Sequence, residues 1–230
     1  MSVIKTKDLV KVYTDIAVPV HALNDVDLEI KEGEFTAIVG PSGCGKTTLL
    51  NMIGGLDTPT SGHVEINGVD ISTLSDSKLI EFRQKNIGFV FQSYNLIPVL
   101  TAKENIEFIM LLQKKSKAER DARVKELLEE VDMIDKIDVK PVDLSGGQQQ
   151  RVSVARALAS KPKFILADEP TANLDSVTTS NLLDLMSKLN VEEKMTFIFS
   201  THDQRVIDKA HRVITLIDGK IESDVNQTPS

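Results

Sequence analysis

Short, continuous runs of hydrophobic residues recur along the chain, and each run ends at glycine or at polar residues. The clearest runs lie at 35–39, 86–91, 163–167 and 196–201. Such runs are typical of strands that are buried on both faces of a parallel sheet. Strand and helix patterns alternate over 33–92 and 162–220. The pattern predicts an α/β fold in which helices cover a parallel sheet.

The remaining segments show other patterns. Residues up to about Gly33 read as short strands with a turn-rich insert at 15–21, which predicts an antiparallel sheet. The stretch 116–131 is helical and strongly charged, which is typical of a solvated face. We expect one domain over 1–230, with a core at about 1–92 and 156–224, a helical subdomain at about 93–155 and a loose tail at 225–230.

The loop after the first of these runs has the spacing of a phosphate-binding loop, G-x-x-x-x-G-K-[ST], and a helical pattern continues from Thr48. The loop reads Gly40-Pro41-Ser42-Gly43-Cys44-Gly45-Lys46-Thr47. Its glycines permit positive φ angles that turn backbone N–H groups toward a polyanion. Lys46 suits the β- and γ-phosphates and the Thr47 hydroxyl suits Mg²⁺, while the helix dipole adds attraction. The flanking strand and helix favour nucleotide binding over a glycine-rich turn with an incidental lysine.

One residue of this loop carries a separate expectation. Cys44 lies near a helix N-terminus, where thiols tend to be reactive. We therefore expect a thiol reagent to modify Cys44 and bound ATP to block that modification.

Two adjacent acids, Asp168 and Glu169, follow the run at 163–167. Ligands of parallel sheets bind beyond the carboxyl ends of the strands, where these acids fall. Asp168 would hold the Mg²⁺ shell, and Glu169 would polarise the attacking water. Alternatively, Asp-Glu-Pro170 simply starts a helix, because acids and proline are favoured in a first turn. On their own the two interpretations are about equally good, and the Lys46 loop favours the catalytic one.

Two further strand ends carry polar residues. Gln92 follows the run at 86–91, and His202 follows the run at 196–201. A glutamine can bridge metal and water, and a histidine can hold a γ-phosphate while changing protonation near neutral pH. Either residue alone is more often a capping or loop residue, so their order along the chain is what makes them informative.

With these motifs in this order, the chain resembles the nucleotide-binding subunit of an ATP-binding-cassette (ABC) transporter, from about Ile4 to Glu222. The resemblance implies a P-loop NTPase (RecA-like) core with an antiparallel β subdomain and a helical signature-motif subdomain. The family's signature motif matches Leu144-Ser145-Gly146-Gly147-Gln148. In the family this motif binds the γ-phosphate of ATP held by the other subunit. A helical pattern follows at 148–158, so the motif also reads as a second anion-binding helix start, or simply as a turn with Ser145 as the helix N-cap.

The resemblance also implies roles for single residues and a set of partners. Gln92 falls on the Q-loop, Asp175 on the D-loop and His202 on the switch histidine. Tyr13 falls where the family stacks a ring on adenine, although an aromatic in an early strand is usually core. The cofactors would be ATP and Mg²⁺. ATP would join two copies head to tail, and hydrolysis would let the pair separate.

The chain departs from the commonest family pattern at Cys44 and at Asp143. Segments around 15–21, 55–62 and 91–98 resemble a subgroup with the ATPases of lipoprotein release, macrolide and peptide export, and cell division. This implies an ATPase that powers a membrane subunit in export or extraction of a lipoprotein, peptide or drug-like substrate. The alternative is a mechanotransmitting or regulatory ATPase without net transport.

Composition narrows the remaining possibilities. The chain has 230 residues, 41% of them hydrophobic, so it can bury a full core. Its net charge of -7 argues against a general nucleic-acid surface. The single cysteine excludes an intrachain disulfide and suits a reducing cytosol. Neither a signal peptide nor a bilayer-spanning segment is expected.

Any membrane attachment must then come through a partner. We expect the chain in the cytoplasm, peripheral on the cytoplasmic face of the membrane. The apolar, aromatic and turn-prone segment from Tyr94 to Leu100 lies where the family docks a membrane subunit. The alternative is that its apolar residues pack under the helical subdomain, and the residues favour neither.

Overall fold

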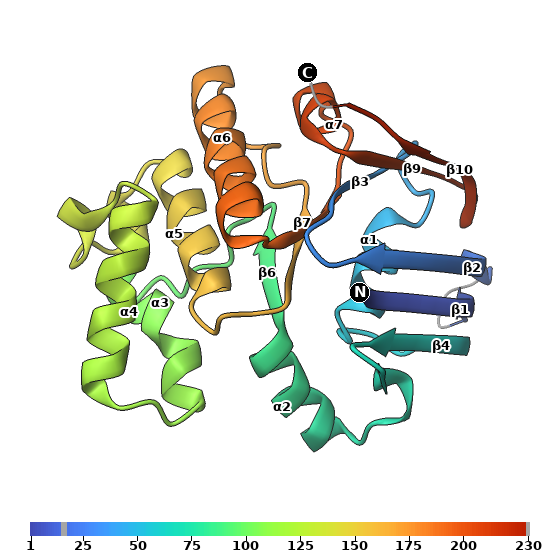
Figure 1. Cartoon of the computed structure of the whole chain (residues 1–230), viewed down its shortest axis with the longest axis horizontal. Coiled ribbons are helices and arrows are strands. Elements are labelled where there is room, and N and C mark those ends of the chain that lie inside the picture. The colour runs from blue at the N-terminus through green and yellow to red at the C-terminus, as the bar shows by residue number, and fades with distance from the viewer. Residues whose placement is uncertain (15–17, 229–230) are drawn as a thin grey trace.

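The computed structural model describes residues 1–14 and 18–228. Within them lie two sheets, one at the side of the molecule and one through its centre (Figure 1). The side sheet is antiparallel, as predicted, with order β2-β1-β4-β5. Its strands are β1 (Ser2–Tyr13), β2 (Val20–Lys31), β4 (Ser61–Ile66) and β5 (Val69–Asp70). Of the predicted insert, 15–17 lie outside the described residues, whereas Val20 and His21 belong to β2.

The central sheet has the order β10-β9-β3-β8-β7-β6 and is parallel except for β10. Its strands are β3 (Phe35–Val39), β6 (Ile87–Phe91), β7 (Phe164–Asp168), β8 (Thr196–Ser200), β9 (Arg212–Ile217) and β10 (Lys220–Asn226). Every hydrophobic run singled out in the sequence forms one of these strands.

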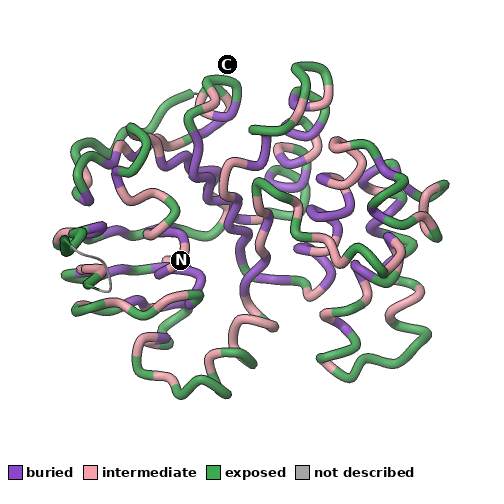
Figure 2. Tube along the Cα trace, turned by 180° about the vertical axis from the view of Figure 1, so that it is seen from behind, coloured by how far each residue is buried: buried purple, intermediate pink, exposed green. Residues whose placement is uncertain are grey.

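Hydrophobic residues cover both faces of this sheet, and Figure 2 shows the buried chain at the centre of the molecule. Along β7, Phe164 and Leu166 pack in the cluster shared with the antiparallel sheet. Ile165 and Ala167 pack in the cluster shared with the helices on the opposite face. Successive side chains of a strand point to opposite faces, so two buried faces require a continuous hydrophobic run.

The helices of the described chain cover both faces of the central sheet. Three of them, α3 (Ala102–Leu112), α4 (Lys117–Glu130) and α5 (Gly146–Leu158), gather on the side away from the antiparallel sheet (Figure 1). The others are α1 (Lys46–Ile53), α2 (Asp76–Asn86), α6 (Ser176–Glu193) and α7 (Gln204–Lys209). No helix in the described part of the chain is both long and apolar enough to cross a membrane.

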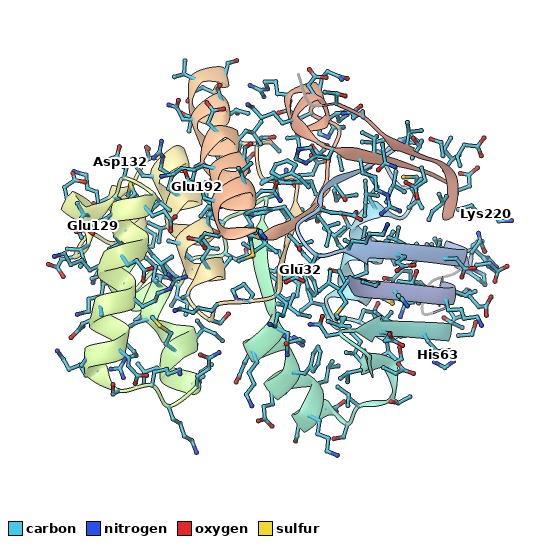
Figure 3. All side chains as sticks on the ribbon, in the orientation of Figure 1. Glu32, His63, Glu129, Asp132, Glu192 and Lys220 are labelled. Atoms are coloured by element: carbon cyan, nitrogen blue, oxygen red, sulfur yellow. The ribbon has the colours of Figure 1, made fainter. Side chains whose placement is uncertain are left out.

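Helix α4 begins after the N-cap residue Ser116, whose capping box with Glu119 fixes its first turn. Its buried face carries Val124, Leu127 and Leu128. Glu129 lies on the exposed side (Figure 3). The predicted solvated face is therefore one side of an amphipathic helix.

The structure differs from the predicted boundaries at helix α5 and at the C-terminal end of the described chain. Helix α5 runs through residue 155 to Leu158 without interruption, so the predicted boundary between core and helical subdomain falls inside this helix. The expectation of a loose tail from residue 225 is wrong for its first residues, because β10 reaches Asn226. Val225 pairs with Val213 of β9, and the Gln227 N–H donates to the His211 carbonyl at 2.8 Å. Backbone pairing, which polar composition does not reveal, orders this end.

Candidate functional site

The loop at 40–47 connects β3 to α1 and has the backbone conformation that its glycines predict. The φ angles of Gly40, Gly43 and Gly45 are 146°, 79° and 107°. Gly45 is the N-cap residue of α1 and supplies no side-chain acceptor to the first turn. The N–H groups of that turn therefore meet no capping side chain, and a helix start of this kind is a ready site for an anion.

A cleft of about 300 Å³ opens beside this loop and brings together Tyr13, Lys46, Thr47, Thr48 and Glu169. The Lys46 ammonium donates to the carbonyl oxygens of Gly40 at 2.9 Å and Pro41 at 3.1 Å. These bonds hold the cation over the loop. The lining joins residues of β1, α1 and the end of β7, which are far apart in sequence.

Asp168 ends β7 directly beside the helix that starts at Lys46. The Thr47 hydroxyl donates to Asp168 Oδ1 at 3.2 Å. Hydroxyl and carboxylate oxygens are ligands that Mg²⁺ prefers, and Mg²⁺ is usually bound by one or two carboxylates together with substrate phosphates. Within the described residues there is no cluster of three or more His, Cys, Asp or Glu side chains suited to a metal. The pair therefore fits Mg²⁺ arriving with a nucleotide.

Glu169 follows Asp168 in the left-handed region, with φ 46°. Its carboxylate lies 2.8 Å from His202 Nδ1, and the Thr201 hydroxyl donates to its other oxygen at 3.3 Å. The Glu169 side chain is 16% exposed and that of His202 is 76% exposed. Two residues that follow β8 thus orient the carboxylate that follows the neighbouring strand β7. The alternative helix start at Asp-Glu-Pro is wrong, since α6 begins only at Ser176.

Gln92 and Asp175 lie around this centre. Gln92 follows β6 and is exposed, and its carbonyl oxygen accepts from the Asn173 side chain at 3.0 Å. Asp175 caps α6 by accepting from the Val177 and Thr178 N–H groups, both at 3.0 Å. Hydrogen bonds from the Thr178 side chain and backbone lower the pKa of Asp175. Among the described residues, Glu169 lines the cleft and Gln92 does not.

The signature segment at 144–148 opens helix α5. Leu144 is buried, and Ser145 forms a capping box with Gln148 through bonds of 3.3 and 2.9 Å. A Cβ on Gly146 would lie 2.8 Å from the Tyr94 hydroxyl, and one on Gly147 would lie 2.3 Å from Thr178 Cγ2. The helix N-cap interpretation of Ser145 is therefore correct as structure, and it leaves the anion-binding role a prediction.

The segment after Gln92 is held by α5. Tyr94 and Asn95 both have positive φ, and Arg156 donates to both of their carbonyl oxygens. Leu96 packs against the hydrophobic core, while Val99 is 70% exposed. The core-packing interpretation therefore holds for Leu96, and docking of a membrane subunit on this segment stays a prediction.

The burial of Cys44 argues against the expected modification by a thiol reagent. Its side chain is only 4% exposed and packs in the hydrophobic cluster under the loop. A Cβ on Gly40 would lie 2.8 Å from its sulfur atom. Burial limits the access of reagents to the thiol. The position of Cys44 near the start of a helix does not reveal this burial.

Some residues of the site were not predicted. The Ser200 hydroxyl lines the cleft and is buried, with no hydrogen-bond partner in the described chain. Its place at the carboxyl end of β8 was the available signal. Gln150 connects the start of α5 to the segment that follows β7, because its side-chain amide donates to the Pro170 carbonyl at 2.7 Å. No sequence signal marks that contact.

A glycine loop of this geometry between a parallel strand and a helix, beside a second strand that ends in Asp-Glu, defines a P-loop NTPase. The ABC transporter family profile matches residues 23–172. The chain belongs to the ABC transporter family, and it is an ATPase of that family that binds ATP.

Similar proteins agree with this assignment. An uncharacterized ABC transporter ATP-binding protein of Thermotoga maritima is 48% identical over 220 residues, covering 96% of this chain and 94% of that protein. The ABC cassette MJ0796 of Methanocaldococcus jannaschii has solved dimeric structures, one described as a post-hydrolysis state bound to ADP and Pi. These match with TM-score 0.91 and 44% identity, covering 99% of this chain and 100% of that chain.

A longer protein also matches. The macrolide export ATP-binding/permease protein MacB of Mannheimia succiniciproducens is 43% identical over 229 residues. The match covers 100% of this chain and 36% of MacB. Most of MacB therefore has no counterpart in this chain.

Proposed function

We propose that this chain powers a membrane subunit by ATP-driven closure of a head-to-tail homodimer, in export or extraction of a lipoprotein, peptide or drug-like substrate. The observation that carries the proposal is the meeting of two pairs beside the Lys46 loop. Thr47 contacts Asp168, and Glu169 contacts His202. The MacB similarity supports export as the direction of transport.

Each residue of these pairs has a proposed role in hydrolysis. Lys46 and the N–H groups of the loop bind the phosphates, and Tyr13 stacks on the base. Thr47 and Asp168 would hold Mg²⁺, with Gln92 as a further ligand. When bound, Mg²⁺ neutralises charge that develops on the phosphate oxygens. Glu169 polarises the attacking water, and His202 contacts the γ-phosphate.

The second copy completes the site. The signature segment of one copy would bind the ATP held by the Lys46 loop of the other. Asp175 of the D-loop would lie near the same interface. The dimeric MJ0796 structures support a dimer of cassettes. Closure of the pair would then depend on ATP, and hydrolysis would reopen it.

The membrane subunit would bind at an apolar groove of about 410 Å³ between β6 and α3. The groove is lined by Ile97, Phe108 and Leu112, and the last two are 44% and 50% exposed. Exposed apolar side chains around a hollow favour a protein partner. Ile97 belongs to the 94–100 segment. The proposal therefore puts the chain in the cytoplasm, held at the membrane by this partner.

The first experiment purifies the Glu169→Gln protein from detergent-solubilised membranes of its own host with ATP present. This variant should bind ATP, stay dimeric and lose nearly all turnover. A multi-spanning membrane protein should copurify. Adding Phe108→Ser should release that protein, whereas Val191→Ser, at a 70% exposed valine of α6, should not.

Three outcomes would contradict the proposal or part of it. Full hydrolysis by Glu169→Gln would overturn the role of Glu169. A trapped dimer without any membrane protein would favour a soluble ATPase. If the partner copurifies but the reconstituted complex moves no substrate, the mechanotransmitting alternative is preferred.

A further inference from the structure

Tyr13 is held by a charged pair that lies outside the motifs of the site. The Tyr13 hydroxyl donates to Asp57 Oδ2 at 3.0 Å. Asp57 Oδ1 accepts from Lys11 Nζ at 2.8 Å and from the Thr58 N–H at 2.7 Å. Lys11 Nζ also lies 4.8 Å from the centroid of the Tyr13 ring. The ring is thus fixed at its hydroxyl and covered on one face by an ammonium group.

Tyr13 lines the cleft beside Lys46, whereas Lys11 is absent from the described lining. The Lys11 side chain is 12% exposed, so it lies packed behind the ring. A ring that borders the phosphate-binding cleft and carries a cation over one face can stack on a ligand with its other face.

Asp57 and Lys11 together form a clamp on the Tyr13 ring. Its carboxylate, that of Asp57, follows the helix that starts at the phosphate loop. Helix α1 begins at Lys46 and ends at Ile53, four residues before Asp57. Thr60 then joins the end of β1, because its hydroxyl accepts from the Val12 N–H at 2.9 Å and its N–H donates to the Val10 carbonyl at 2.8 Å. The phosphate loop before α1 and the segment that follows α1 therefore contact opposite parts of the same cleft, the first at Lys46 and the second through Tyr13.

The charge state of Asp57 agrees with this geometry. Burial opposes its ionisation, but the hydrogen bonds from Lys11, Thr58 and Tyr13 outweigh that effect and lower the pKa of Asp57. Its carboxylate is therefore ionised at neutral pH and can accept from all three donors.

We propose that Asp57 and Lys11 are positioning residues that hold the Tyr13 ring in place to stack on the nucleobase. This inference rests on the proposed stacking role of Tyr13. A ring already fixed in its binding orientation loses less conformational freedom when the base arrives. Loss of the clamp should therefore weaken binding of the base and leave binding of the phosphates unchanged.

The test compares two probes, the non-hydrolysable analogue AMP-PNP and inorganic tripolyphosphate, by titration calorimetry. Asp57→Ala should raise the Kd for AMP-PNP by about two- to tenfold. Its Kd for tripolyphosphate should equal that of the unaltered chain. Tyr13→Phe, which keeps the ring and removes the bond to Asp57, should give a shift in the same direction if Asp57→Ala does not fold. Glu129→Ala, at an exposed carboxylate of α4, serves as the control.

A double variant separates the clamp from other effects. Asp57→Ala combined with Tyr13→Ala should bind AMP-PNP as Tyr13→Ala alone does, because Asp57 acts only through the ring. Equal loss of tripolyphosphate binding would mean general damage to the site and would overturn the inference. So would normal AMP-PNP binding by Asp57→Ala and Tyr13→Phe where Tyr13→Ala binds weakly. Normal AMP-PNP binding by Tyr13→Ala would instead remove the stacking role on which the inference rests.

Discussion

The phosphate loop at 40–47 and the signature segment at 144–148 both place glycines at the start of a helix, but their glycines differ in conformation. In the phosphate loop Gly40, Gly43 and Gly45 have positive φ. In the signature segment Gly146 and Gly147 have ordinary helical positions, and neighbouring side chains occupy the space of a Cβ. The phosphate loop needs glycine for its backbone conformation and, at Gly40 and Gly45, for close packing as well, whereas the signature segment needs it for close packing alone.

The two helix starts differ in the same way. Gly45 gives α1 no side-chain cap, whereas Ser145 and Gln148 form a capping box on α5. The first site is open to an anion within one chain, while the second is already partly satisfied by its own side chains. Similar sequence signals therefore arise from different physical requirements. The two loops can be separated experimentally.

The largest expected difference between the two loops is in ATP binding by the single chain, and Lys46→Ala reveals it. Removing this cation should weaken ATP binding by the single chain about ten- to hundredfold, because hydrogen bonds to charged groups contribute most. Gly147→Ala should leave ATP binding by the single chain unchanged. Titration with AMP-PNP at dilute protein measures both. Equal losses in the two variants would mean that the loops do not have separate roles.

The next effect concerns the packing behind Gly147. Gly147→Ala should abolish dimer formation in the Glu169→Gln background, because the new methyl group meets Thr178 Cγ2. Thr178→Ser removes that methyl group and keeps the hydroxyl that donates to Asp175. The combined variant should recover the dimer, as measured by light scattering with ATP. Failure of Thr178→Ser to restore it would show that packing is not the reason for this glycine.

A smaller effect separates backbone strain from packing in the phosphate loop. A Cβ on Gly43 would meet nothing within 4 Å, whereas one on Gly40 would lie 2.1 Å from the Leu216 carbonyl oxygen. Gly43→Ala should therefore lower the free energy of unfolding by about 1–2 kcal/mol, the cost of a left-handed alanine. Gly40→Ala should lower it more. Urea unfolding of the nucleotide-free protein gives both values, and equal costs would contradict the distinction.

The smallest effect concerns Asp175, which caps α6 and accepts a hydrogen bond from Thr178, the residue packed against Gly147. Asp175→Ala should lower the free energy of unfolding at neutral pH, because α6 loses its side-chain cap. The pKa of Asp175 is lowered in the folded chain, so its contribution is present above the unfolded pKa of about 3.9. This contribution is lost as pH falls through the folded pKa. Urea unfolding across pH 3–7 should show the gap narrowing in acid, and a constant gap would contradict the assignment.

Sequence patterns predict the features that local chemistry controls. The buried strands follow from continuous hydrophobic runs, and the positive φ angles of the Lys46 loop follow from its glycines. Asp168 and Glu169 were expected beside Thr47, because ligands gather at the carboxyl ends of parallel strands. The structure brings Thr47 and Asp168 together at 3.2 Å.

Contacts between distant segments could not be predicted in this way. Tyr13 bonds to Asp57 across 44 positions, and no periodicity connects the two residues. The burial of Cys44 and the pairing of Val225 with Val213 also depend on how the elements pack. The roles of Gln92, Asp175 and the signature segment involve a second chain or a ligand, so they stay predictions.

Helix α5 has a consequence for how displacement travels through the molecule. Its first turn carries the signature glycines, Gln150 bonds to Pro170 beside Asp168 and Glu169, and Arg156 and Ala157 near its end line the apolar groove. Thirteen residues of α-helix make a stiff rod of about 20 Å. A displacement of the groove end of α5 would therefore be transmitted to its first turn. A partner that binds in the groove would then also change the position of the segment at 144–148.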